Sequence, residues 1–209
     1  MGYMRQIQIR KHFDTIAKTY DSYKKDKPYY LGAILYSLNK VIKPKSNIFD
    51  YGGGTGNILS ALPFKIGVGY DISEGMIKVA KRKFGHLQGI KFSNSLPSQK
   101  PFDYILLVDV IEHLASVEKT CRELKPYCNK NTVIIISYVD SIWEPVLWIM
   151  EKMGLKMPEG PHKRISINKL VKIFQTEGYV LTKRESIPLN KWLPISPITF
   201  LYFKDQVLR

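Results

Sequence analysis

The chain has 209 residues, of which 44% are hydrophobic and 24% are charged, and these proportions are typical of one globular domain. No run of about 18 apolar residues occurs, which excludes a membrane-spanning helix. The two cysteines, Cys121 and Cys128, are too few for a disulfide framework. Residues 1–11 lack the apolar middle of a secretory signal, so the sequence predicts a cytoplasmic protein.

The formal net charge of +14 is carried mainly by the two ends of the chain. Residues 1–45 have 10 Lys and Arg against 3 Asp and Glu, and residues 141–209 have 11 against 6, whereas residues 46–140 have 11 against 9. Basic flanks indicate an anionic partner, such as a phosphate-bearing substrate, nucleic acid or an acidic membrane face. A basic surface that serves only solubility is the alternative.

The first half of the chain alternates between helical and strand patterns. Apolar periodicity predicts an amphipathic helix over residues 4–23 and a second helix over residues 29–42. A buried strand follows at residues 47–51 and runs into the glycine-rich segment 52–56. A second strand is expected at residues 66–70, and a helix that begins after the capping residue Ser73 continues to Phe84.

The alternation continues in the second half. Strands are expected at residues 90–93, 102–108 and 132–137, with a helix near 117–124 between the last two. A helix capped by Ser166 ends at Gly178, and a closing pair of strands covers residues 179–185 and 199–204. Apolar strands that alternate with helices predict an α/β fold with a Rossmann-like, doubly wound and mostly parallel sheet.

The first strand ends in Asp50-Tyr51-Gly52-Gly53-Gly54-Thr55-Gly56, at the edge where open α/β sheets bind ligands. Glycines let the backbone turn tightly and approach a ligand closely. The dinucleotide fingerprint needs a third glycine where this chain has Asn57, which argues against a nicotinamide or flavin. Asp50 could hold an ammonium group, and Asp71, at the end of the second strand, could accept hydrogen bonds from both ribose hydroxyls. S-adenosylmethionine, a nucleoside that bears an amino acid and no phosphate, fits both carboxylates.

These motifs lead to a family. Nearly the whole chain resembles the class I S-adenosylmethionine-dependent methyltransferases, and most closely those related to the ubiquinone and menaquinone biosynthesis enzymes. Besides the glycine loop, the matching segments are Phe13–Asp21, Gly69–Ser73, Phe102–Asp103, Val108–Leu114 and Arg122–Pro126. The resemblance implies a seven-stranded sheet with its last strand antiparallel. It also implies S-adenosylmethionine as the cofactor and S-adenosylhomocysteine as the product.

The resemblance divides one methyltransferase domain, residues 1–209, into four parts. N-terminal lid helices occupy residues 1–45, the cofactor-binding core 46–140, an insertion over the acceptor site 141–165, and a C-terminal helix and strand pair 166–209. The apolar face from Trp143 to Leu155 is expected either to be core or to cover a lipid-like acceptor. With its neighbouring basic residues it could also rest on an anionic membrane.

The resemblance also assigns site residues. Cofactor contacts fall on the glycine loop, the neighbouring strand ends and the lid, at Tyr20, Asp50, Tyr51, Gly52, Gly53, Gly54, Gly56, Asp71, Ile72, Asn94, Ser95 and Asp109. Asn94 stands where the family usually offers an acid to the adenine amino group. Asp109, Glu112 and His113 are expected to shape the acceptor pocket, and we assign no metal to them, although similar sets hold a divalent metal in some relatives.

His113 and His162 are the candidate catalytic residues, because a histidine can take the proton of a hydroxyl nucleophile. For His162 the alternative is an exposed loop residue. The sequence thus predicts an enzyme that methylates an oxygen of a small or lipid-linked, anionic acceptor. An RNA methyltransferase is one alternative, favoured by the net charge, although no Asn-Pro-Pro-Tyr-like motif follows the fourth strand. A non-catalytic, cofactor-binding subunit of another enzyme is the other.

Overall fold

A seven-stranded sheet forms the centre of the protein in this computed structural model, which describes residues 2–25, 28–139, 149, 152, 165–187 and 198–206. The strand order is β3-β2-β1-β4-β5-β7-β6, and β7 runs antiparallel to both of its neighbours. The strands are β1 (Ser46–Tyr51), β2 (Phe64–Tyr70), β3 (Ile90–Ser93), β4 (Tyr104–Leu107), β5 (Val133–Val139), β6 (Tyr179–Ile187) and β7 (Ile198–Asp205). This arrangement confirms the fold predicted from the sequence.

Two apolar cores cover the two faces of the sheet, because successive strand residues point to opposite sides. Phe49 and Ile105 lie in one core with residues of α6 (Val117–Leu124) and α8 (Ile167–Thr176). Ile48 and Leu106 lie in the other, with residues of α3 (Pro28–Val41), α4 (Asn57–Ser60) and α5 (Glu74–Phe84). Burial on both faces explains why these strands read as continuous apolar runs.

The N-terminal segment forms two helices, α1 (Gly2–Ile16) and α2 (Tyr20–Lys25), so the expectation of one helix over residues 4–23 is wrong. Thr19 explains the break, since its backbone N–H and its hydroxyl both donate hydrogen bonds to the carbonyl of Ile16. Such local side-chain bonds compete with the helical ladder and favour its end. The break redirects the chain toward the glycine loop.

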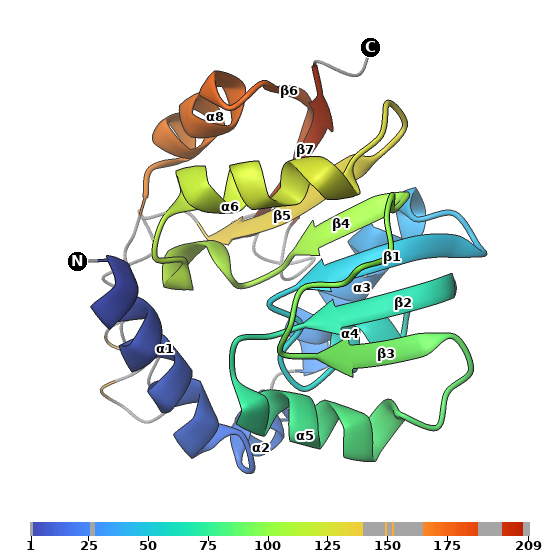
Figure 1. The fold of residues 1–209 in the computed structure, drawn as a ribbon, viewed down its shortest axis with the longest axis vertical. Coiled ribbons are helices and arrows are strands. Elements are labelled where there is room, and N and C mark those ends of the chain that lie inside the picture. The colour runs from blue at the N-terminus through green and yellow to red at the C-terminus, as the bar shows by residue number, and fades with distance from the viewer. Residues whose placement is uncertain are drawn as a thin grey trace.

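Helix α1 lies across the sheet edge at which the parallel strands end (Figure 1). Its C-terminal end packs on α5 through a small third cluster, in which Phe13 and Ile16 lie against Ala17, Met76 and Val79. Gly75 permits the close approach, because a Cβ there would lie 3.0 Å from the Cβ of Ala17 and 3.2 Å from the backbone of Asp14. The N-terminal helices therefore lie over the edge where a ligand is expected, and their role as a lid stays a prediction.

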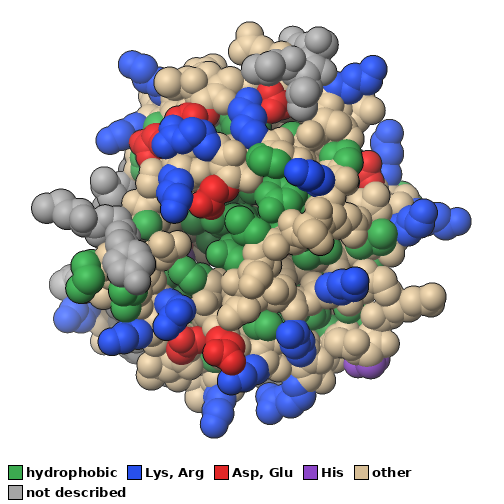
Figure 2. All heavy atoms as spheres, viewed as in Figure 1, with side chains coloured by type: hydrophobic (Ala, Val, Ile, Leu, Met, Phe, Trp, Pro, Cys, Tyr) green, Lys and Arg blue, Asp and Glu red, His purple; other side chains and the backbone are tan. Residues whose placement is uncertain are grey.

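The connection between β3 and β4 contains no helix, and the hydroxyl of Tyr127 donates to the carbonyl of Pro97 at 3.0 Å, which fixes this connection. Figure 2 shows hydrophobic side chains in the hollowed centre of the face seen there, with Lys and Arg side chains around them.

No helix within the described residues is long and apolar enough to cross a bilayer. Of residues 140–164, only Ile149 and Lys152 are described, so the predicted insertion and His162 lie outside the described residues.

Candidate functional site

The glycine loop turns sharply at the end of β1. Gly52, Gly54 and Gly56 have φ values of 83°, 53° and 81°, in the left-handed region that favours glycine. The N–H groups of Gly52 and Gly53 both donate to the carbonyl of Tyr70, at 2.7 and 2.9 Å, which ties the loop to the end of β2. A Cβ on Gly54 would meet nothing within 4 Å, so the backbone at this position faces open space. The loop thus forms an open cradle beside β2.

Asp71, at the end of β2, lies directly against this cradle. Its Oδ2 accepts a hydrogen bond from the N–H of Gly54 at 2.9 Å, and its Oδ1 accepts one from the N–H of Ser73 at 2.8 Å. Burial raises the pKa of Asp71 to about 6, against the lowering effect of these two backbone bonds. Each carboxylate oxygen has a further lone pair. Asp71 can therefore accept additional hydrogen bonds from a ligand, as predicted for ribose hydroxyls.

Asp50 is 2% exposed and lies beneath the loop. A Cβ on Gly53 would lie 2.9 Å from Oδ2 of Asp50, so only a glycine lets the loop pass this close to the carboxylate. Tyr51 is placed differently, because its hydroxyl donates to Glu123 of α6 at 3.2 Å. The side chain of Tyr51 thus packs into the core with α6, and its backbone remains at the loop.

The end of β3 lies next to Asp71, whose N–H donates to the carbonyl of Ser93 at 3.2 Å. The two residues that follow, Asn94 and Ser95, are exposed, and Ile72 is half-buried. The structure therefore brings the predicted cofactor residues of three strand ends to one edge of the sheet. Their contacts with a cofactor remain a prediction.

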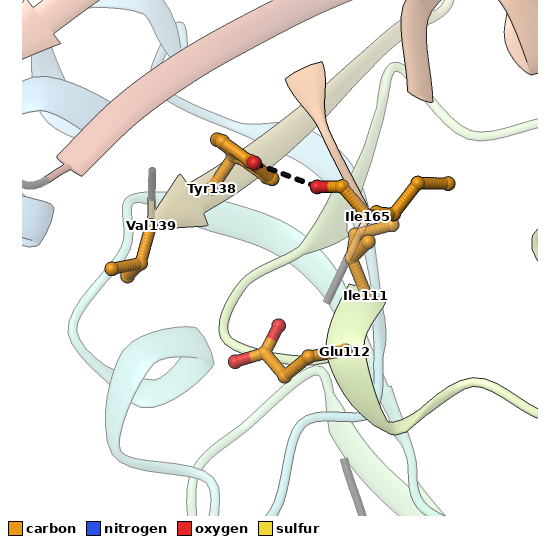
Figure 3. Close-up of a pocket in the computed structure, with 5 residues that line it drawn as sticks. All are labelled: Ile111, Glu112, Tyr138, Val139 and Ile165. Atoms are coloured by element: carbon orange, nitrogen blue, oxygen red, sulfur yellow. Dashed lines mark hydrogen bonds between the residues drawn. The ribbon is translucent and has the colours of Figure 1, made fainter. Parts of the chain in front are cut away.

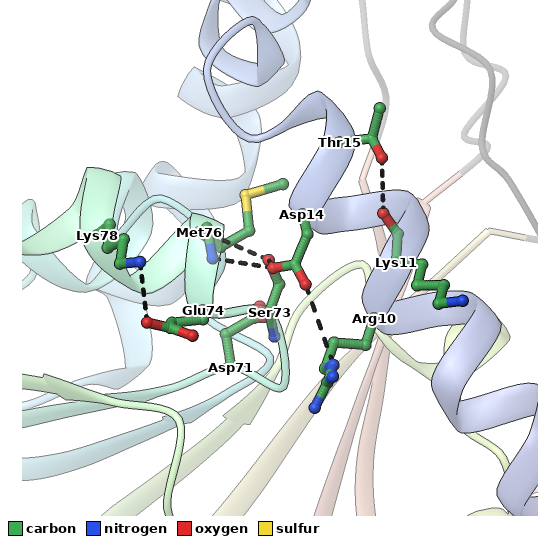
Figure 4. Close-up of polar contacts among 10 residues, drawn as sticks. Arg10, Lys11, Asp14, Thr15, Asp71, Ser73, Glu74, Met76 and Lys78 are labelled. Carbon is green, nitrogen blue, oxygen red and sulfur yellow. Dashed lines mark hydrogen bonds and ion pairs between the residues drawn. The ribbon is translucent and has the colours of Figure 1, made fainter.

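Helix α1 is attached to the β2 side of this edge through Asp14 (Figure 4). Oδ1 of Asp14 accepts hydrogen bonds from the hydroxyl of Ser73 at 2.7 Å and from the N–H of Gly75 at 2.9 Å. Ser73 also caps α5 by accepting from the N–H of Met76. Asp14 thus supplies a negative charge at the N-terminus of α5, where the helix dipole favours it.

Helix α2 is attached to the other side of the edge through Asp21. Oδ1 of Asp21 accepts from the hydroxyl of Thr55 at 2.6 Å and from the side-chain amide of Asn57 at 2.9 Å. Oδ2 accepts from Nζ of Lys83 at 2.5 Å. Burial alone would raise the pKa of Asp21, but the hydrogen bonds from Lys83, Thr55 and Asn57 outweigh it and hold this pKa below its ordinary value.

Asp14 and Asp21 were not predicted as site residues, although both lie in the segment that resembles the lid. The sequence held a signal for their importance, because they are two of only three acidic residues in the basic segment 1–45. Tyr20, which was predicted to contact the cofactor, begins α2, with its ring centroid 6.5 Å from that of Phe13.

Asp109, after β4, lies in a hydrogen-bonded group with Tyr30 and Ser137. Its φ of 54° is unusual for a residue with a side chain. The hydroxyl of Tyr30 donates to Oδ1 of Asp109 at 2.6 Å, and the hydroxyl of Ser137 donates to the same oxygen at 3.1 Å. Burial and the charge of Asp109 raise the pKa of Tyr30 well above its ordinary value, so Tyr30 acts as a donor. Tyr30 and Ser137 were not foreseen from the sequence.

The 3₁₀ helix η1 (Ile111–His113) follows Asp109 in the chain and borders the site there. A small hollow beside it is lined by Ile111, Glu112, Tyr138, Val139 and Ile165, and the carboxylate of Glu112 points into it (Figure 3). The ring of His113 meets that of Phe13 of α1 edge-on, with centroids 5.1 Å apart. Among the described residues, no group of three His, Cys, Asp or Glu side chains is arranged to hold a metal ion.

A family model described as "Methyltransferase domain" matches residues 23–183, which is more than half of the chain. An uncharacterized protein of Methanocaldococcus jannaschii is 31% identical over 133 residues, which make up 61% of each chain. The match therefore spans less than two thirds of that relative.

Solved structures share the fold at low sequence identity. A SAM-dependent methyltransferase from Thermotoga maritima is 17% identical, with a TM-score of 0.70 over 95% of this chain and 99% of that one. Magnesium protoporphyrin IX methyltransferase from Synechocystis, with bound SAH, is 15% identical, with a TM-score of 0.67 over 95% and 98% of the two chains. A Haloferax volcanii methyltransferase in complex with the activator Trm112 is 17% identical, with a TM-score of 0.69 over 93% and 97%.

The strand order, the antiparallel β7 and the glycine loop at the end of β1 agree with these comparisons. The comparisons confirm the family inferred from the motifs. The closer resemblance to the ubiquinone and menaquinone group stays a prediction. The chain belongs to the methyltransferase domain family and has the fold of the class I S-adenosylmethionine-dependent enzymes.

Proposed function

We propose that this protein transfers the methyl group of S-adenosylmethionine to an oxygen of a small or lipid-linked, anionic acceptor and releases S-adenosylhomocysteine. The observation that carries the proposal is the hydrogen bond of 2.9 Å between the N–H of Gly54 and Asp71. It joins an open glycine cradle to a buried carboxylate. A cradle with the carboxylates of Asp50 and Asp71 beside it suits a cationic nucleoside better than a pyrophosphate.

The residues present fit this cofactor. Asp71 would hold the ribose hydroxyls, and Asp50 with the glycine loop would hold the amino-acid end. Asn94 and Ser95, which are exposed at the end of β3, would face the adenine. The cofactor supplies an activated methyl group on a sulfonium, so the protein has to orient the acceptor, exclude water and receive a proton.

The acceptor would enter beside η1. A small hollow there is lined by the apolar side chains of Ile111 and Val139, by Tyr138 and by the carboxylate of Glu112. His113 is the proposed base, since it belongs to η1 and packs against the lid residue Phe13. His162, the other candidate, lies outside the described residues.

The test has two steps. Calorimetry should first detect binding of S-adenosylhomocysteine to the purified protein, with Asp71→Ala as the variant that loses it. Radioactive S-adenosylmethionine is then incubated with pooled lipid, sugar and RNA extracts, and label should pass to an anionic small molecule or lipid. A protein that binds neither cofactor form would refute the proposal.

An RNA methyltransferase is the second candidate, and the net charge of +14 favours it. Label transfer into the RNA pool, with no transfer into the other two, would establish this alternative. Co-purification with a stoichiometric partner and no activity alone would instead favour a non-catalytic subunit. Flotation with anionic vesicles tests peripheral membrane contact separately.

A further inference from the structure

Two buried side-chain nitrogens on α1 have no hydrogen-bond partner, namely Nε of Arg5 and Nε2 of His12. The two residues share one face of the helix with Ile9, which is 4% exposed, because spacings of four and three residues bring side chains to the same side. Buried polar groups in native proteins are nearly always hydrogen-bonded to protein, water, an ion or a ligand. A group outside the fold is therefore expected to bind these two nitrogens on the inner face of α1.

Arg5 lies against η1. Nη2 of Arg5 donates to the backbone carbonyl of Glu112 at 3.1 Å, which fixes the guanidinium against η1. The ring of His12 is 5.2 Å from that of Phe13, and Phe13 in turn lies 5.1 Å from His113. Arg5 thus lies against the segment that borders the hollow of Figure 3.

The chemistry of the Arg5 guanidinium indicates which kind of group would bind its unpartnered Nε–H. The Nε–H and one N–H of Nη2 form the edge of a guanidinium that binds two oxygens of a carboxylate or phosphate side by side. Nη2 has two hydrogens, and the carbonyl of Glu112 takes one of them. The buried Nε–H is therefore the donor on this edge that an oxyanion between α1 and η1 would satisfy.

The carboxylate of Glu112 excludes the hollow itself as the place for that anion, because it points into the hollow and would repel a negative charge (Figure 3). Arg5 contacts the carbonyl of the same residue, on the side of α1. An anionic group would accordingly lie between α1 and η1, where Arg5 contacts the Glu112 carbonyl.

We infer that Arg5 is a specificity-determining residue that binds the carboxylate or phosphate of the methyl acceptor. His12, two helical turns and about 10.5 Å further along α1, donates to another oxygen of the same molecule. This inference rests on the proposed function, since it names the chemical class of the acceptor for the same site.

The experiment uses the wild-type protein saturated with S-adenosylhomocysteine and titrated with sodium phosphate or sodium acetate. The Nε–H signal of Arg5, assigned by its loss in Arg5→Lys, is followed by proton–nitrogen NMR. Sodium chloride at the same ionic strength is the control for screening. Phosphate or acetate should shift this signal along a saturable curve, whereas chloride should not.

Calorimetry of variants gives the second readout. Arg5→Lys keeps the charge and a donor for the carbonyl of Glu112 but lacks the paired edge, so we expect oxyanion binding about tenfold weaker. Arg10→Lys makes the same change on the exposed side of α1, where the Arg10 side chain is 57% exposed, and should bind like the wild type. Affinity for S-adenosylhomocysteine should be equal in all three proteins, which reports that the lid remains in place.

Each outcome decides something. Saturation by phosphate alone or by acetate alone identifies the acceptor group as a phosphate or a carboxylate. A linear, chloride-like response of Arg5 in the wild type, or equal anion affinity in Arg5→Lys, would overturn the inference. Failure of the wild type to bind S-adenosylhomocysteine would instead refute the proposed function. The titration of Arg5 with phosphate and acetate would still show whether Arg5 binds an oxyanion.

Discussion

The carboxylate of Asp21 in α2 accepts a hydrogen bond of 2.6 Å from the hydroxyl of Thr55 in the glycine loop. Asp14 of α1 accepts one of 2.7 Å from the hydroxyl of Ser73, which follows the end of β2. The two N-terminal helices are thus attached to the segments after β1 and β2, two of the strand ends that are proposed to hold the cofactor. Cofactor affinity should therefore depend on carboxylates that do not belong to the cofactor cradle.

The variant Asp21→Asn tests this dependence. It keeps an oxygen for Thr55 and Asn57 but removes the charge that pairs with Lys83 at 2.5 Å. We expect the free energy of unfolding, measured with urea, to fall by about 1–3 kcal/mol. The dissociation constant of S-adenosylhomocysteine, measured by calorimetry, should rise by about tenfold.

Glu74→Gln is the matched control for Asp21→Asn. It also removes one negative charge, from an ion pair with Lys78 whose side chains are 62% and 73% exposed. Exposed pairs contribute little, so stability should change by no more than about 0.5 kcal/mol. Equal effects of the two variants on cofactor affinity would mean that overall charge, rather than the Asp21 contact, is responsible.

The second prediction concerns the contact between α1 and α5. In Gly75→Ala the new Cβ would lie 3.0 Å from the Cβ of Ala17 and 3.2 Å from the Asp14 backbone, so α1 has to move away. We expect a loss of about 1–3 kcal/mol in the free energy of unfolding, with weaker binding of S-adenosylhomocysteine. Gly32→Ala, in α3, meets nothing within 4 Å and should stabilise the protein by about 0.4–1 kcal/mol. A stable, fully binding Gly75→Ala would contradict the role of this contact.

Local chemistry explains why the sheet could be predicted from the sequence. Ser73 accepts from the N–H of Met76 as the expected cap of α5, and the apolar runs at β1, β4 and β5 are buried on both faces. Positive φ values at Gly52, Gly54 and Gly56 match the expected cradle. These features depend on neighbours in the chain or on periodicity, which a single sequence displays.

The side of the site formed by the N-terminal helices could not be predicted in the same way. The contacts of Asp14 with Gly75 and of Tyr30 with Asp109 join residues 61 and 79 positions apart. No periodic pattern encodes such pairs. The break between α1 and α2 was also missed, because Thr19 fits a helical pattern until its hydroxyl binds the carbonyl of Ile16.

The third prediction is a pH dependence of cofactor binding. Burial raises the pKa of Asp71 to about 6, so the carboxylate is mostly ionised at pH 7 and becomes protonated below pH 6. A protonated carboxyl accepts the ribose hydroxyls less well, so affinity for S-adenosylhomocysteine should be constant from about pH 8 to 7. Below about pH 6 it should fall, by up to about tenfold per pH unit. Asp71→Asn should show weak binding that does not follow this curve, and the same profile in both proteins would contradict the assignment.

The effect of Asp71 on stability has the opposite sign. Its pKa is about 6 in the folded protein and 3.8 in the unfolded chain, so the folded state binds the proton more tightly. The contribution of Asp71 to stability is fully present below pH 3.8 and is lost as the pH rises through 6. Wild-type protein should therefore lose stability relative to Asp71→Asn between these values, as measured by urea unfolding at each pH.

The last prediction separates two roles of Asp109. In Tyr30→Phe, Asp109 loses the donor at 2.6 Å and keeps the hydroxyl of Ser137 at 3.1 Å, so its carboxylate is held less firmly. If Asp109 binds the cofactor, as the sequence predicts, the affinity for S-adenosylhomocysteine should fall by about five- to tenfold, or about 1–1.4 kcal/mol, because a less firmly held carboxylate binds the cofactor less well. Tyr36→Phe removes a hydroxyl from the same helix at a residue that is 63% exposed, and it should behave like the wild type. Unchanged affinity together with slower methyl transfer in Tyr30→Phe would mean that Asp109 contacts the acceptor instead.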